Sequence, residues 1–257
     1  MSQLVDRTIA ALRSEHDDLA GLVRTFTDDQ LAATSGATDW TVAQVLSHLG
    51  SGAEIGRAPI ARAAGETVAA EDNQTIWARW DASAPRVQAE GFLEHNGRWL
   101  ETVEALTPEQ RSSLTVDLGF LPEPVPLVTA LGMRLSEVAN HSWDVRVAFD
   151  PDAAVHAGSA EVLVDLLTGP VSFILGFVAK PKELAAPVSV AVPGAALVID
   201  DSVTVVEDLE APSATFTGPA EAFVRLVSGR LKAPYDKGVT VEGSITLDDL
   251  RRVFPGF

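Results

Sequence analysis

The hydrophobic pattern of this chain changes its period near residue 151, and that change limits the folds open to it. Before residue 151, apolar residues recur every three or four positions, as on one face of an α-helix. Beyond it come short runs rich in β-branched residues, bounded by Pro, Gly and Asp. We therefore expect an α+β protein with two domains, a helical domain over residues 1–150 and an α+β domain over residues 151–257.

Four long helices are predicted in the first domain. An amphipathic helix of about six turns carries Val5 to Phe26. A second begins near DWTVAQVLSHLG, with Asp39 or Thr41 as its N-cap. The third pattern runs from about 73 to 106 and the fourth from about 127 to 149. Four helices joined by short and longer connections favour a four-helix bundle.

The second domain should combine helices with a mostly antiparallel sheet. A helix is expected from Ser159 to about Val178, followed by strands at PVSVAVPG, ALVIDD, SVTVVED and SATFTG. GPAEAFVRLVSGR is predicted to form a helix, VTVEG a strand, and TLDDLRRVF a terminal helix. Helices packed on such a sheet give an α+β fold.

Composition excludes several classes of function. The 257 residues include no cysteine, which rules out disulfides and any mechanism that uses a protein thiol. A formal charge of −17 argues against nucleic-acid binding and against anionic membrane surfaces. The charged N-terminus does not resemble a signal peptide, and the longest apolar run, GPVSFILGFVAKP, is interrupted by proline and lysine. We predict that this run is buried and that the protein is soluble and cytoplasmic.

The stretch EVANHSWD raises the possibility of a metal site. Glu137 and His141 are four residues apart, and Asp144 follows three residues later, so a helix would project all three from one face. His48, on the flank of the second helix's apolar stripe, could complete a His₂Glu set that suits zinc and leaves one position open. Spacing alone also allows these residues to be the solvated face of the helix.

The segments DWTVAQVLSHLG and EVANHSWDVRVAF together resemble the mycothiol-dependent maleylpyruvate isomerase family, within the DinB-like superfamily of metal-binding four-helix bundles. That family pattern has a Trp-Thr helix start, then a histidine, then a late Glu-x-x-x-His-x-x-Asp helix. Trp40, Thr41 and His48 match its first part. A Gly-Arg pair after the last long helix of a sterol-carrier-like second domain is matched by Gly229 and Arg230.

The resemblance implies a zinc-dependent enzyme with His48, Glu137 and His141 as ligands, although nickel, iron or manganese would also suit this set. It implies mycothiol as the thiol that attacks an electrophilic small molecule. Family members that isomerise maleylpyruvate are expected to place a catalytic arginine before an asparagine, but here Asp72 precedes Asn73. A dicarboxylate needs fixed cations, so a thiol S-transferase is the preferred prediction.

Two alternatives stay open beside the transferase, a thiol-dependent cis–trans isomerase and a non-catalytic metal-binding or small-molecule-binding protein. Either a monomer or a homodimer is compatible with the sequence.

Other residues are candidates for the site because of their positions in the predicted helices. Asp144, Arg79 and Arg230 are candidate catalytic residues, and Trp143, Arg230 and His16 are candidate substrate-binding residues, although a core role is open for both His16 and Trp143. Trp77, Trp80 and Trp99 are predicted core residues, and His95 a surface residue.

Overall fold

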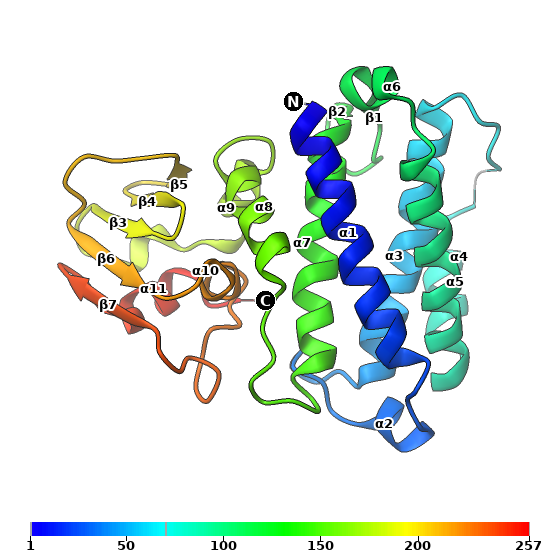
Figure 1. Cartoon of the computed structure of the whole chain (residues 1–257), viewed down its shortest axis with the longest axis horizontal. Helices are drawn as coiled ribbons and strands as arrows, with labels where there is room; N and C mark the ends of the chain where they lie inside the picture. Colours follow the sequence, from blue (N-terminus) through cyan, green and yellow to red (C-terminus); the bar gives the residue numbers. More distant parts are fainter. Residues whose placement is uncertain (1, 70, 257) are drawn as a thin grey trace. The chain divides into compact units, whose positions relative to one another are not determined.

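The chain divides after Ala153 into two units, Met1–Ala153 and Ala154–Phe257. The computed structural model describes residues 2–69 and 71–256. Helices make up most of the first unit, while the second combines helices with a five-stranded sheet (Figure 1). The predicted α+β class is confirmed.

Four long helices form the bundle of the first unit. They are α1 (Ser2–Val23), α3 (Val42–Ala63), α5 (Pro85–Glu104) and α7 (Leu127–Arg146). Both α1 and α3 pack against α5 and α7, which gives each helix two neighbours (Figure 1). Shorter elements connect them, namely α2 (Asp28–Ala32), α4 (Asn73–Asp81), α6 (Pro108–Ser113) and a ribbon of β1 (Thr115–Val116) with β2 (Val125–Pro126).

The core of the bundle follows the predicted apolar stripes. All four long helices contribute buried leucines and valines, and Trp99 of α5, 2% exposed, is among the largest buried side chains. Gly50 shows how closely α3 and α4 approach, because a Cβ atom at this position would lie 2.2 Å from Cη2 of Trp80. Only glycine leaves room for that indole, which fixes α4 against α3.

Two helices of the bundle differ from the prediction. The third predicted helix is two helices, α4 and α5, because Ala84 precedes Pro85 and adopts an extended conformation (φ −66°, ψ 151°). The fourth ends at Arg146, three residues early. Trp80 and Trp99 are buried as predicted, but Trp77 is 42% exposed, so its assignment to the core was wrong.

The second unit is built on a sheet of order β5-β4-β3-β6-β7. Its strands are β3 (Val188–Val192), β4 (Ala195–Ile199), β5 (Val203–Val206), β6 (Ala214–Thr217) and β7 (Thr240–Gly243), with only β3 and β6 parallel among the pairs. Helix α10 (Ala220–Val227) packs on this sheet through Phe223, whose ring lies 6.3 Å from that of Phe216. Helices α8 (Ala157–Leu167) and α11 (Leu247–Val253) also belong to this unit.

The helix expected from Ser159 to Val178 is broken in the structure. It ends at Leu167, and after the turn at Gly169-Pro170 the chain forms η1 (Ser172–Ile174) and α9 (Leu175–Val178). Val171 and Leu175 are buried in this run, but Phe177 is 73% exposed, so the run is not buried throughout as predicted. Within residues 2–69 and 71–256 no single helix is long and apolar enough to cross a membrane. Helix α8 and the η1–α9 segment meet both criteria only when they are taken together, and the chain bends by 84° between them.

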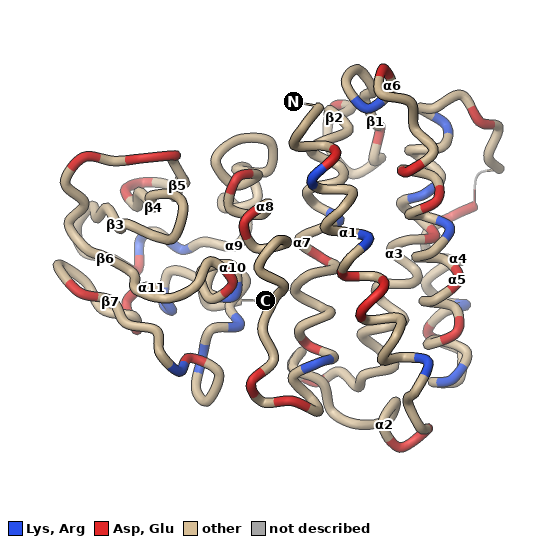
Figure 2. Tube along the Cα trace, viewed as in Figure 1, with Lys and Arg blue, Asp and Glu red and all other residues tan. Residues whose placement is uncertain are grey.

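The excess of acidic residues is not gathered in one region. Figure 2 shows Asp and Glu in both units, with Lys and Arg interspersed among them. Many form ion pairs across the bundle, as between Arg13 of α1 and Glu104 of α5, whose Nη2 and Oε2 atoms are 2.6 Å apart. Such exposed pairs contribute about 0.2–1 kcal/mol each, so packing rather than charge holds the helices together.

Candidate metal centre

His48 projects from the second turn of α3 toward α7. The helix begins at Thr41, whose hydroxyl accepts a hydrogen bond from the backbone N–H of Gln44, while the Gln44 side chain accepts from the N–H of Thr41. This capping box fixes where the helix starts and therefore which face carries each residue. Leu46 and Leu49 are fully buried, whereas the His48 side chain is 42% exposed.

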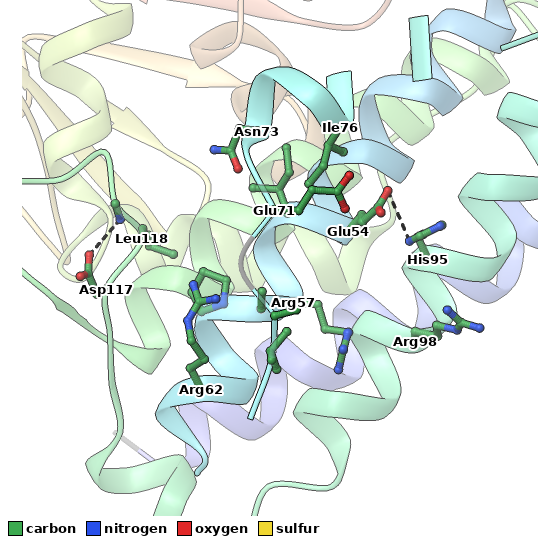
Figure 3. Close-up of a pocket in the computed structure, with 16 residues that line it drawn as sticks. Glu54, Arg57, Arg62, Glu71, Asn73, Ile76, His95, Arg98, Asp117 and Leu118 are labelled. Carbon is green, nitrogen blue, oxygen red and sulfur yellow. Dashed lines mark hydrogen bonds and ion pairs between the residues drawn. The ribbon is translucent and has the colours of Figure 1, made fainter. Parts of the chain in front are cut away.

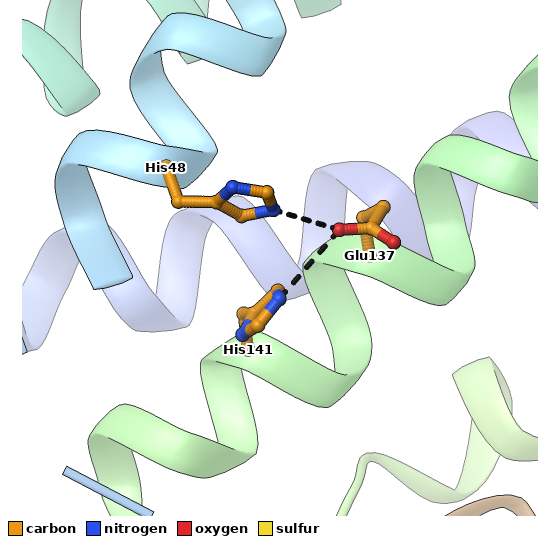
Figure 4. Close-up of side chains that lie close together, drawn as sticks. All are labelled: His48, Glu137 and His141. Carbon is orange, nitrogen blue, oxygen red and sulfur yellow. Dashed lines mark hydrogen bonds and ion pairs between the residues drawn. The ribbon is translucent and has the colours of Figure 1, made fainter. Parts of the chain in front are cut away.

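Helix α7 brings Glu137 and His141 to the same place. The two residues are one turn apart on one face, and α7 packs directly against α3. His48 Nε2 donates a hydrogen bond of 2.9 Å to Glu137 Oε2, and His141 Nε2 lies 3.6 Å from the same oxygen (Figure 4). One potential ligand atom from each residue lies within 4.8 Å of the others. Three donor atoms from two helices therefore converge on one point.

The ring of His141 is held by Asp144. The Asp144 side chain is completely buried, and its Oδ2 atom lies 2.8 Å from Nδ1 of His141. Because a carboxylate only accepts hydrogen bonds, Nδ1 carries the proton and the lone pair is left on Nε2, the nitrogen that faces Glu137. Asp144 thus selects both the orientation and the tautomer of His141.

The loop before α3 covers one side of this cluster. Its Gly36 N–H donates a 2.7 Å hydrogen bond to the backbone oxygen of Asp144, and a Cβ at Gly36 would lie 2.6 Å from Cγ1 of Val147. The loop then places the Trp40 ring 5.2 Å from that of His48 and stacks it at 5.9 Å on His141. The sequence motif includes Trp40, but no role at the site was predicted for it. Its position directly before the N-cap Thr41 could have indicated that it lies near His48.

The carboxylate of Glu137 is ionised in this environment. Partial burial opposes its ionisation, but the hydrogen bond from His48 and the electrostatic interactions with His141, His48 and Arg134 outweigh that effect and lower the pKa of Glu137 to about 2. The side chain is also 52% exposed, so the cluster is open to solvent on one side. The site therefore offers two imidazole nitrogens, one negative charge and access for a small molecule.

The other sequence-predicted site residues lie elsewhere or are engaged by neighbours. Arg79 binds the carboxylate of Glu54, with Nη2–Oε1 at 2.7 Å. His16 is buried against Asn96, and the nearest nitrogens of the two side chains are 2.7 Å apart. Arg230 belongs to the second unit, where its Nη1 donates to the backbone oxygen of Ser228.

Trp143 and His95 also have defined surroundings. Trp143 is 1% exposed and donates from Nε1 to the backbone oxygen of Ala153 at 2.9 Å, which makes it a residue of the bundle core. His95 is only partly exposed; its Nδ1 lies 3.7 Å from Oε2 of Glu54. It is therefore not the freely solvated surface residue that the sequence suggested.

A separate hollow of about 410 Å³ lies among α3, α4, α5 and the segment that follows β1 (Figure 3). Its lining mixes arginines such as Arg57 and Arg62 with carboxylates such as Glu54 and Glu71. None of the three clustered residues His48, Glu137 and His141 lines it. The converging donor atoms and this hollow are therefore distinct features of the first unit.

Comparison with known proteins gives consistent matches to one family. The family model described as the mycothiol maleylpyruvate isomerase N-terminal domain matches residues 12–146. No curated protein matches the chain. Two crystal structures, of a mycothiol-dependent maleylpyruvate isomerase and of a histidine-to-alanine mutant of it, share the fold, each with a TM-score of 0.61 and 17% identity over 94% of both chains. Because the family model covers more than half of its residues, this chain belongs to the family of the mycothiol maleylpyruvate isomerase N-terminal domain.

Proposed function

We propose that this protein is a metal-dependent enzyme that uses a low-molecular-weight thiol to attack an electrophilic small molecule. The observation that carries the proposal is the convergence of His48, Glu137 and His141 within 4.8 Å, with His141 oriented by a buried carboxylate. The solved structures with the same fold are of a mycothiol-dependent enzyme, which supports mycothiol as the thiol.

The spacing of the donor atoms suits a tetrahedral ion such as zinc. Two ligand atoms that each lie about 2.0 Å from a tetrahedral zinc ion are about 3.3 Å apart. The Nε2–Oε2 distances of 2.9 Å from His48 and 3.6 Å from His141 lie on either side of that value. Two neutral imidazoles and one carboxylate are a donor set that zinc accepts, with one position left for an external ligand. When bound, the metal would stabilise the thiolate form of the thiol.

Residues of the chain would bind the metal, orient its ligands and shield it from water. His48 and Glu137 bind the ion from two helices that the bundle holds at a fixed separation. Asp144 keeps the proton of His141 on Nδ1, away from the metal side. The Trp40 indole covers the two imidazole rings on one side and limits access of water. Because the chain has no cysteine, the nucleophilic sulfur must come from the small thiol.

The surroundings of α4 favour transfer of the thiol over isomerisation of a dicarboxylate. Asp72 occupies the position where the family resemblance leads us to expect an arginine, and it caps α4 by accepting a hydrogen bond from the N–H of Thr75 at 3.1 Å. Arg79, which could have compensated, is paired with Glu54 and lies 3.5 Å from Glu71. Isomerisation of the maleylpyruvate type is the second candidate, and the fold shared with that isomerase supports it.

The proposal is tested on untagged protein purified without chelator. We expect about one zinc ion per chain by elemental analysis, together with consumption of an activated electrophile only when a thiol is present. A transferase consumes one thiol for each electrophile, whereas an isomerase returns the thiol unchanged. Protein that contains no metal and takes up none from added zinc would contradict the proposal. Metal binding without affinity for any thiol would support the non-catalytic alternative.

Asp144→Asn tests the role of the buried carboxylate. The amide cannot take the place of a negative charge next to the protonated Nδ1 of His141, so we expect zinc affinity to fall by about 10–100-fold. The affinity is measured by competition with a chromophoric chelator. Asp150→Asn, at an exposed position beyond the end of α7, is the control and should bind zinc as the unmodified protein does. Equal affinity for both variants would mean that Asp144 does not act on the site.

A further inference from the structure

Arg134 carries a partly buried positive charge into the region where α3 and α7 meet. It lies on α7 one turn before Glu137, and its Nη2 donates two hydrogen bonds. One goes to the backbone oxygen of Leu49 at 2.8 Å, and the other to Oδ1 of Asn96 at 2.7 Å. The guanidinium carbon also lies 5.8 Å from the centre of the Trp99 ring. Arg134 therefore contacts α3 and α5 as well as its own helix.

The charge of this guanidinium is not neutralised by a direct ion pair. Among residues 2–69 and 71–256, no carboxylate lies within ion-pair distance of Arg134, and its buried Nε has no hydrogen-bond partner. Burial lowers the pKa of Arg134 to about 10, which still leaves it a cation at neutral pH. Buried charges are usually paired because removing them from water is costly. A partly buried cation without a direct ion pair therefore needs a functional explanation.

The neighbours of Arg134 are arranged to hold it in place. Asn96 accepts from the guanidinium, and its amide nitrogen lies 2.7 Å from Nδ1 of the buried His16. On α3, a Cβ atom at Gly52 would lie 3.0 Å from Nη1 of Arg134, so the missing side chain leaves room for the cation. The position of the charge is thus fixed by α1, α3 and α5.

Both parts of the three-residue cluster lie next to this charge. Leu49, whose backbone oxygen binds Arg134, follows His48 directly, and Glu137 is on the next turn of the same helix face as Arg134. Each of the two charges affects the other, since Arg134 helps to lower the pKa of Glu137 while Glu137 raises that of Arg134. Glu137 is therefore the carboxylate whose charge Arg134 offsets at longer range.

We propose that Arg134 is a positioning residue of the metal centre, which offsets the negative charge of Glu137, weakens metal binding and keeps the loaded centre attractive to anions. This inference rests on the metal-binding role proposed above. Without Arg134, a divalent ion and the carboxylates of Glu137 and Asp144 have a net charge of zero; with it, the sum is +1. A charge that lies one helical turn from a partly buried site acts strongly on both a bound cation and an incoming anion. Arg134 acts through Glu137 and does not itself bind the ion.

The test compares Arg134→Gln with Arg134→Lys by titration with Co²⁺. Glutamine keeps a hydrogen-bond donor but removes the charge, whereas lysine keeps the charge. We expect the glutamine variant to bind Co²⁺ roughly tenfold or more tightly than the unmodified protein, and the lysine variant to stay close to it. The Co²⁺-loaded glutamine variant should also bind acetate more weakly, as followed in the visible spectrum. A purely structural role predicts the opposite sign for Co²⁺, because loosened helices weaken binding.

The control is Arg146→Gln, which removes another arginine of α7 with little exposure, one whose Nη2 lies 3.4 Å from Oε2 of Glu15. Its affinity for Co²⁺ should equal that of the unmodified protein. Equal affinities for Arg134→Gln and Arg134→Lys, tighter binding in the Arg146 control, or weaker binding in Arg134→Gln would each overturn the role of Arg134. Absence of Co²⁺ binding by the unmodified protein would instead remove the metal centre itself, so the two failures are distinguishable.

Discussion

Replacement of His141 by alanine is expected to yield protein that purifies with almost no metal. Zinc sites with four protein ligands have binding free energies of about 10–16 kcal/mol, so one ligand accounts for about 3 kcal/mol, or roughly a hundredfold in affinity. The actual loss should be larger here, because the substitution also leaves the buried Asp144 carboxylate without its imidazole partner. Elemental analysis and zinc titration of the purified variant measure the effect.

His95→Ala is the matched control for that experiment. His95 is also a histidine of the bundle, partly exposed and 3.7 Å from a glutamate, but it lies on α5, and Glu54 is its neighbour. Its variant should keep about one zinc ion per chain, while His48→Ala should lose zinc as His141→Ala does. If all three variants bound zinc equally, the cluster on α3 and α7 would not be the metal centre.

The i, i+4 relation of Glu137 and His141 could be read from the sequence because it depends only on the helix period. Whether His48 would meet them could not be, since that depends on how two helices of the bundle pack against each other. Periodicity placed His48 on the edge of an apolar stripe, and such a position is compatible with solvent or with a neighbouring helix. The packing of α3 on α7 supplies the missing information.

The errors in the fold prediction have local causes. Pro85 forces the preceding residue out of the helical region and divides the third predicted helix, although the apolar spacing continues across the break. Helix α8 ends at Leu167, two residues before Gly169-Pro170, where proline lacks the N–H that a continued helix would need. Trp77 was assigned to the core because it is apolar and helical, but on the short α4 it is 42% exposed. Spacing describes one helix and says little about which neighbour covers it.

The partial burial of the Arg134 side chain could not be predicted from the sequence. In the sequence Arg134 comes three residues before Glu137, so on the predicted helix it shares a face that could equally be solvated. In the structure its guanidinium is instead partly buried and donates hydrogen bonds to Leu49 and Asn96. No local pattern distinguishes a buried arginine from an exposed one, because its partners here come from helices more than thirty residues away in the chain. Its burial depends on tertiary contacts alone.

Replacement of Trp143 by alanine should produce the largest loss of stability among the variants described. The indole is 1% exposed, and its Nε1 donates to the backbone oxygen of Ala153, so alanine would leave both a cavity and an unpaired carbonyl. Removal of a buried tryptophan costs about 3–5 kcal/mol of unfolding free energy. Urea denaturation followed by circular dichroism at the helical band measures the loss, since the bundle contributes most of the helix.

Trp77→Ala provides the comparison, because that indole is 42% exposed and its removal should cost much less. The sequence left two roles open for Trp143, lining a pocket or filling the bundle, and the pair of variants separates them. A core role predicts a large loss of stability in Trp143→Ala with zinc still bound to the molecules that remain folded, because neither ligand atoms nor Asp144 are removed. A stability close to that of Trp77→Ala, combined with loss of thiol affinity, would mean that the indole contacts the substrate instead.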